Sequence, residues 1–193
     1  MKAIILAVLL ICIAPTAQAE GEVLAFSVGG STPSVSGPGV SPAFNGLLSW
    51  GPAVGLTLGK RLTDWLQVDV LDLGFGSQTH DQFGKVVSDR LSLGSAVRFG
   101  VFSRRLNLGM VGVQPYFLAG LGGSRMGLSC RSCGGFSDWG FEWSVGGGIQ
   151  LAIDKGTAGV QYRYRSASIE NADFGQHSLS VEFGFVALPD LVR

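Results

Sequence analysis

Few residues of this chain have the types and spacing needed for catalysis, metal binding or redox chemistry. Two of them, Cys130 and Cys133, form its only C-x-x-C motif. Such a pair can close a small disulfide, act as a redox centre or supply half of a metal site. A redox centre calls for a thioredoxin-like helix start, which the surrounding sequence lacks. The only histidines, His80 and His177, show no Cys/His ligand pattern with the motif. We therefore expect a disulfide in an oxidising compartment, with no metal and no cofactor.

A second group of candidates is charged and stands in stretches where apolar and polar residues alternate. In "GVQYRYRS", residues 159–166, the tyrosines fall on one face and Arg163 and Arg165 on the other, which is typical of a β-strand. The charged residues on such polar faces are Asp69, Arg98, Glu142, Arg163, Arg165 and Glu182. They could line a polar pore or a proton path, but a structural ion-pair network is favoured, because buried charges must be paired. If the last two strands are joined by a loop at 169–174, Arg163 should lie roughly opposite Glu182.

The composition is unusual for a soluble domain. Only 15% of the residues are charged, the mean hydropathy is +0.35, and 30 of the 193 residues are glycine. A soluble domain carries about 25% charged residues and about 7% glycine. The formal net charge is 0, so there is no basic surface that would point to nucleic acid.

The first residues predict export. "MKAIILAVLLICIAPTAQAE" has a lysine at its start, an apolar stretch too short to span a bilayer, and a small-x-small cleavage site that ends at Ala19. We expect a signal peptide over 1–19 and a mature domain over 20–193, beginning at Glu20.

The mature sequence has no apolar run long enough for a membrane-spanning helix. Since only helices and closed β-barrels satisfy the backbone in lipid, a hydrophobic exported chain without such a helix predicts a barrel. Eight alternating segments can be counted: 22–30, 49–60, 65–76, 89–103, 111–125, 139–153, 157–168 and 175–187. The expected fold class is all-β, an eight-stranded antiparallel transmembrane up-and-down β-barrel.

The sizes of the two faces decide which of them meets lipid. Over 139–153, one face carries large apolar and aromatic residues and the other carries mostly glycine, serine and a few long polar groups. An eight-stranded barrel is only just wide enough inside for side chains, so the small and charged face should point inward. One segment departs from simple alternation, and a β-bulge near Val70–Leu71 would bring its two halves into phase.

The connections and the aromatic residues indicate an orientation. Longer connections at 31–48, 77–88, 126–138 and 169–174 alternate with shorter ones near 61–64, 103–109 and 154–156. Outer-membrane barrels have this pattern, with long loops outside and both termini in the periplasm. The aromatic residues predicted near the outer strand ends are Trp50, Phe75, Trp139, Phe141 and Tyr164, and those near the periplasmic ends are Trp65, Phe102, Phe117 and Phe185. Two such bands match interfacial girdles.

Several segments resemble a known family. "RLTDWLQVDVLDLGFGS", "QPYFLAGLGGS", "WSVGGGIQLAI", "GVQYRYRS" and "HSLSVEFGF" are similar to strands of the small eight-stranded outer-membrane barrels, the OmpA-like and opacity-protein-like porin superfamily. The resemblance covers most of the mature chain and implies a porin-like transmembrane protein of a Gram-negative cell envelope. Such barrels usually end on an aromatic residue, whereas this chain continues past Phe185 as "VALPDLVR".

The expected function follows from the family resemblance and from the small number of candidate catalytic or ligand-binding residues. We expect a structural or surface-interaction role in the bacterial outer membrane, through the extracellular loops and without catalytic residues. The expected partners are lipopolysaccharide, phospholipid and host or envelope ligands at the loops, with no nucleic acid, and the expected state is a monomer.

Two alternatives stay open. One is a narrow porin-like channel, and the other is an outer-membrane hydrolase that resembles lipid A deacylases. Those enzymes carry a His-x-Ser-Asn stretch on the seventh strand, where this chain has Arg165-Ser166-Ala167-Ser168. A serine needs a base to activate it, and only His177 on the next strand could approach Ser166 or Ser168.

Overall fold

The computed structural model describes residues 21–36, 50–63, 65–80, 86–101, 106–108, 111–130, 134–153, 156–169 and 172–187. Within these residues the chain forms β1 (Gly21–Ser36), β2 (Gly51–Arg61), β3 (Leu66–His80), β4 (Val86–Gly100), β5 (Leu106–Leu108), β6 (Val111–Cys130), β7 (Gly134–Ile153), β8 (Gly156–Ile169) and β9 (Ala172–Ala187). The predicted signal peptide lies outside the described residues. No helix in the described ranges is long and apolar enough to cross a membrane.

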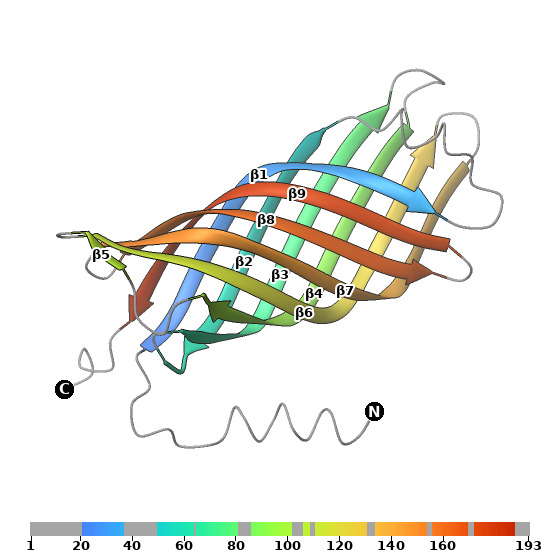
Figure 1. Cartoon of the computed structure of the whole chain (residues 1–193). Coiled ribbons are helices and arrows are strands. Elements are labelled where there is room, and N and C mark those ends of the chain that lie inside the picture. Colours follow the sequence, from blue (N-terminus) through green and yellow to red (C-terminus); the bar gives the residue numbers. More distant parts are fainter. Residues whose placement is uncertain are drawn as a thin grey trace, which may run out of the picture.

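The strands close into a barrel (Figure 1). Their order is β4-β3-β2-β1-β9-β8-β7-β6-β5, and β4 also pairs with β6, which joins the two ends of the sheet. Every pairing is antiparallel, and the three-residue β5 only extends the start of β6. Eight long strands therefore form the wall, and the predicted antiparallel up-and-down barrel is confirmed. Closure pairs the edges of the sheet, as a bilayer requires.

The strands are longer than the alternating pattern predicted, mainly at one end of the barrel. β1 continues to Ser36 and β6 to Cys130, whereas the predicted segments stopped at 30 and 125. At the other end, β4 stops at Gly100 rather than at 103. The apolar alternation marks only the lipid-facing part of a strand, but hairpin pairing continues through polar residues beyond it. Much of the predicted loop sequence is therefore strand.

The two ends of the barrel differ. β1 starts and β9 ends at the same end, where β5 also lies; we call it the turn end (Figure 1). At the opposite end, the loop end, the chain passes from β1 to β2, β3 to β4, β6 to β7 and β8 to β9. This arrangement follows from an even number of long strands and brings the N-terminal and C-terminal strands together.

Alternation separates lipid-facing from interior side chains throughout the wall. Large apolar residues lie outside; Phe117, for instance, is 65% exposed and Phe183 is 55% exposed. Polar residues lie inside, where Arg90 is only 2% exposed. The predicted face assignment of "GVQYRYRS" is observed, since Tyr162 is exposed and Arg163 is buried. The core of this protein is polar, and its apolar surface is outside.

Aromatic residues of the described ranges lie toward both ends of the apolar surface. Exposed Trp50, Trp139 and Phe141 lie toward the loop end, and exposed Trp65 and Phe185 lie toward the turn end. Predicted Phe102 lies outside the described residues. Amphipathic rings at these two levels match the interfacial girdles of a membrane barrel.

The predicted β-bulge in β3 is confirmed. The pairing of β3 with β4 passes from Asp69↔Ala96 to Asp72↔Gly94, and the pairing with β2 shifts at the same place. The hydroxyl of Ser95 donates to the carbonyl oxygen of Val70 at 2.8 Å. The side chain of Val70 points outward. Because the bulge inserts one residue, Asp69 and Asp72 both face the interior although their spacing is odd.

Candidate functional site

Among the described residues, eight charged side chains inside the barrel form ion pairs with one another. They come from five strands and comprise Asp69 and Asp72 of β3, Arg90 and Arg98 of β4, Glu142 of β7, Arg163 and Arg165 of β8, and Glu182 of β9. Their side chains are between 2% and 11% exposed. We call the whole set the interior network.

The part of the network nearer the turn end centres on Arg98. Its Nε donates to Oδ2 of Asp69 at 2.7 Å, and its Nη1 donates to Oε1 of Glu182 at 2.6 Å. Gln67 donates to the second oxygen of Asp69 at 2.6 Å. The guanidinium also lies 5.4 Å from the ring centroid of Tyr116, in the range of a cation–π contact. One arginine thus pairs with two carboxylates and holds both in fixed positions, and this part of the network has one negative charge in excess.

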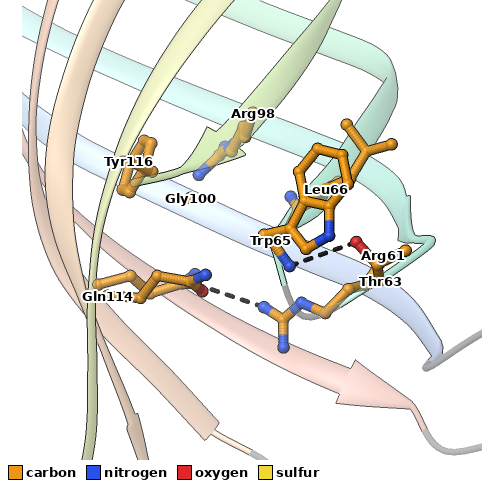
Figure 2. A pocket seen from close by; sticks show the side chains of 10 residues that line it. Arg61, Thr63, Trp65, Leu66, Arg98, Gly100, Gln114 and Tyr116 are labelled. Atoms are coloured by element: carbon orange, nitrogen blue, oxygen red, sulfur yellow. Dashed lines mark hydrogen bonds between the residues drawn. The ribbon is translucent and has the colours of Figure 1, made fainter. Parts of the chain in front are cut away.

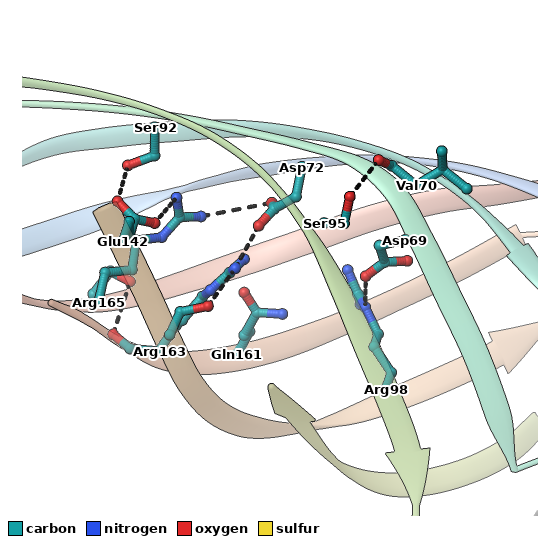
Figure 3. A network of polar contacts seen from close by, with 12 residues as sticks. Asp69, Val70, Asp72, Ser92, Ser95, Arg98, Glu142, Gln161, Arg163 and Arg165 are labelled. Atoms are coloured by element: carbon teal, nitrogen blue, oxygen red, sulfur yellow. Dashed lines mark hydrogen bonds and ion pairs between the residues drawn. The ribbon is translucent and has the colours of Figure 1, made fainter. Parts of the chain in front are cut away.

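The part nearer the loop end is a chain of alternating charges (Figure 3). Asp72 forms ion pairs with both Arg163 and Arg165, the latter at 3.6 Å between Oδ1 and Nη2. Arg165 reaches on to Oε1 of Glu142 at 3.4 Å, and Arg90 binds Oε2 of the same carboxylate at 2.8 Å. Two acids are therefore shared among three arginines.

Several of these pairs cross the lumen. Asp72 and Arg163 lie on β3 and β8, which are four strands apart in either direction around the eight-stranded wall. Arg98 and Glu182, on β4 and β9, have the same relation. Long side chains meet across the barrel because eight strands leave an interior only about two side chains wide. The network therefore links opposite walls as well as neighbouring strands.

Apolar groups cover the network on both sides. Met126 and Ile169 are each 3% exposed and lie on the loop side of Glu142. Leu118 pairs with Arg98, and Tyr116 is one inward position closer to the turn end. These side chains shield the ion pairs from water, which strengthens each charge-assisted hydrogen bond.

At the turn end, amide side chains surround the guanidinium groups of Arg61 and Arg98 and fill the mouth of the barrel (Figure 2). Arg61 is 5% exposed, and its Nη2 donates to Oε1 of Gln150 at 3.3 Å. Gln67, Gln114 and Tyr116 line the same cavity, which has a volume of about 20 Å³. That is room for about one water molecule.

Comparison with known proteins agrees with this geometry. The model of the family described as "Outer membrane protein beta-barrel domain" matches residues 4–185. The chain belongs to this family. It is a bacterial outer-membrane β-barrel protein, in agreement with the closed barrel of the structure. The localisation predicted from the sequence is confirmed. No curated protein sequence matches the chain.

Among solved structures, the barrel is similar to Neisserial surface protein A, with 15% identity and a TM-score of 0.65 over 88% of this chain and 99% of that one. Ail, the attachment invasion locus protein of Yersinia pestis, gives 16% identity and a TM-score of 0.49 over 86% and 99%. The N-terminal barrel domain of Pseudomonas aeruginosa OprF gives 16% identity and a TM-score of 0.49 over 87% of this chain and 100% of that one. At 15% identity, the likeness to Neisserial surface protein A shows the fold alone.

All six charged residues singled out from the sequence belong to the interior network, but one predicted partnership is wrong. Glu182 lies opposite Gly159, and Arg163 lies opposite Ser178. The reason is that Ile169 pairs with Ala172, so that the hairpin is tighter than the predicted loop and the register shifts. Arg163 binds Asp72, and Glu182 binds Arg98.

Sequence reasoning missed two members of the network, Asp72 and Arg90. Arg90 has the same parity as Arg98 on β4, and Asp72 has inward parity once the bulge at Val70–Leu71 is included. Alternation combined with the predicted bulge therefore contained the signal for both.

His177 and Ser168, two residues of the hydrolase alternative, are engaged elsewhere. Nδ1 of His177 shares a hydrogen bond with Oη of Tyr162 at 2.6 Å, and its ring lies 4.8 Å from that of Tyr164. The hydroxyl of Ser168 donates to Oδ1 of Asp173 at 2.7 Å. The predicted approach of His177 to a serine is therefore replaced by contacts with two tyrosines.

The predicted disulfide falls outside the described side chains. Cys130 is the last residue of β6, and Cys133 lies beyond the described residues, so the disulfide stays a prediction. In the part of the chain that the structure describes, no group of three or more His, Cys, Asp or Glu side chains could hold a metal ion.

Proposed function

We propose that this protein is a closed, non-conducting barrel that contributes to the structure or the surface interactions of the outer membrane through its loop end, without catalysis. The proposal rests on the interior network, whose paired charges fill the barrel and lie next to buried apolar side chains such as Met126 and Leu118. A barrel whose interior is occupied in this way acts through its outside.

The network argues against the channel alternative. Ions need a continuous aqueous path, whereas Arg98 and Asp72 each join opposite walls of the lumen. Two cavities among the described residues have volumes of about 20 and 30 Å³. Each has room for about one or two water molecules, which is too little for a hydrated ion to pass. Opening a path would separate buried charges, and that is energetically costly.

Two outer surfaces remain for partners. The lipid-facing wall with its aromatic residues supports binding to phospholipid and lipopolysaccharide. The strands also continue beyond this apolar wall at the loop end, where exposed Thr79, Asp89, Ser137 and Asp173 replace the large apolar residues. A raised polar rim of this kind supports interaction with host or envelope ligands outside the membrane.

Two measurements on one preparation of refolded protein separate the alternatives. In planar bilayers we expect no conductance steps, and regular steps would overturn the closed barrel. Lipid A incubated with the protein should keep its mass, whereas loss of an acyl chain would establish the hydrolase.

A loop-shortened variant distinguishes the structural from the interaction role. Residues 37–49 are replaced by a flexible linker just long enough to reach from Ser36 back to β2, because β1 extends five residues beyond its last pair with β2, Ser31↔Gly51. The variant is compared with the wild type in cells that lack the protein. If the variant restores resistance to bile salts fully, the barrel itself has a structural role. If it restores none, the loop end is required.

A further inference from the structure

A cavity of about 30 Å³ lies inside the barrel beside Arg163 and Arg165, separate from the cavity at the turn end. Its wall is formed by β1, β2, β3, β8 and β9. The described polar side chains that line it are Ser27, Gln161, Arg163, Arg165, Gln176, Ser178 and Ser180. These are guanidinium, amide and hydroxyl groups, all of which can donate hydrogen bonds. Neither acid of the nearby ion pairs, Asp72 or Glu142, is among the described lining residues.

The charges around this cavity do not balance. Arg90, Arg163 and Arg165 share only Asp72 and Glu142, which leaves one positive charge in excess in this part of the network. The part around Arg98 has one negative charge in excess, so that the excess beside the cavity is local and the eight charges of the network sum to zero. The ion pairs of Arg165 are also long, at 3.4 and 3.6 Å. Charge-assisted hydrogen bonds between nitrogen and oxygen are usually about 2.7–2.9 Å long. The guanidinium facing the cavity is therefore only partly compensated.

A second observation is an unmet donor. Arg163 is 5% exposed, and its Nε is buried without a hydrogen-bond partner, although its Nη2 binds both Asp72 and the hydroxyl of Ser144. Buried donors are nearly always satisfied in native structures, so an unmet one beside a polar cavity indicates a bound water or ion.

We propose that the cavity binds a single monatomic anion of the size of chloride, held by Arg163, Arg165 and the neighbouring amide and hydroxyl donors. The cavity has space for one or two waters, so a halide fits and a polyatomic organic anion does not. The anion lies next to the local excess of positive charge and gives Nε of Arg163 a partner. The proposal does not depend on what the loop end binds.

The first experiment compares salts at equal ionic strength. The protein is refolded into lipid vesicles and unfolded with urea in sodium chloride, sodium bromide or sodium gluconate. A ligand that binds only the folded state at a concentration ten times its Kd raises the folding equilibrium constant about 11-fold. We expect a shift of this order in chloride and bromide relative to gluconate. Equal stability in all three salts overturns the proposal.

Variants locate the effect. Ser180→Val places methyl groups in the cavity without removing a charge, and Arg163→Lys keeps the charge but removes Nε; both should lose the halide dependence. Arg61→Lys changes a buried arginine of the other cavity and should keep it. Halide dependence that persists in Ser180→Val, or that disappears in Arg61→Lys, would place the anion elsewhere and overturn the assignment.

A crystal grown in bromide gives the direct readout. An anomalous peak between Arg163 and Ser180 supports the anion site, and a water molecule there without anomalous signal overturns it.

Discussion

Replacing Arg98 with glutamine tests whether the interior network stabilises the barrel. Arg98 binds Asp69 at 2.7 Å and Glu182 at 2.6 Å, and all three side chains are at most 7% exposed. Arg98→Gln removes the positive charge and leaves two carboxylates facing each other in a site that water reaches poorly. The variant is therefore expected to destabilise the barrel strongly.

The size of the loss follows from these contacts. A hydrogen bond to a charged group contributes about 1.5–3 kcal/mol, and Arg98 makes two of them. Removing one partner of a buried ion pair typically costs about 3–5 kcal/mol, because the remaining charge is uncompensated. We expect Arg98→Gln to lower the free energy of unfolding by about 3–5 kcal/mol.

The measurement is urea unfolding of protein refolded into lipid vesicles, followed by gel mobility without heating. A matched control is Arg125→Gln, since Arg125 is exposed on the outer wall and bonds only the hydroxyl of Ser137 among the described residues. The control should change stability by less than about 1 kcal/mol.

A triple variant completes the test. Arg98→Gln combined with Asp69→Asn and Glu182→Gln replaces the charges with amides of similar shape and should recover more than half of the loss, since neutral replacements of buried charges are often tolerated. If Arg98→Gln is as mild as the surface control, or if the triple variant is less stable than the single one, the network does not stabilise the barrel as argued.

Three further predictions use the same unfolding assay. Tyr162→Arg should cost about 2–4 kcal/mol, because it places a charge against lipid; a neutral result would mean that the faces are reversed. Arg163→Asp should impair folding and Asp72→Arg in the same chain should restore much of it, since the two residues pair across the lumen; additive losses would argue against that pair. Gly122→Ala should cost about 1–3 kcal/mol, because its Cβ would meet the backbone of β4, whereas Gly123→Ala, whose Cβ would make only ordinary van der Waals contacts, should be neutral; equal effects would contradict the close approach of β4 and β6.

The sequence could predict which way each side chain points, because alternation is a local property of a strand. Tyr162 and Arg163 are assigned to opposite faces by parity alone, and a barrel in lipid turns the large apolar face outward. The same reasoning located the bulge in β3, since a change of phase within one strand has few other causes. Strand ends were predicted less well, because lipid contact ends before backbone pairing does.

Only the closed tertiary structure decided which charges meet. Asp72 and Arg163 are 91 positions apart and lie on strands that face each other across the lumen, so their contact depends on the register of every pairing between them. The β8–β9 hairpin has another register than predicted, and Arg163 binds Asp72 across the lumen instead of Glu182 on the neighbouring strand. The sequence by itself determined that these charges lie inside, because the alternation of side chains and the sizes of the residues on the two faces can be seen in each strand separately. Their partners required the closed ring, because ion pairing depends on distances across a lumen that no single strand contains.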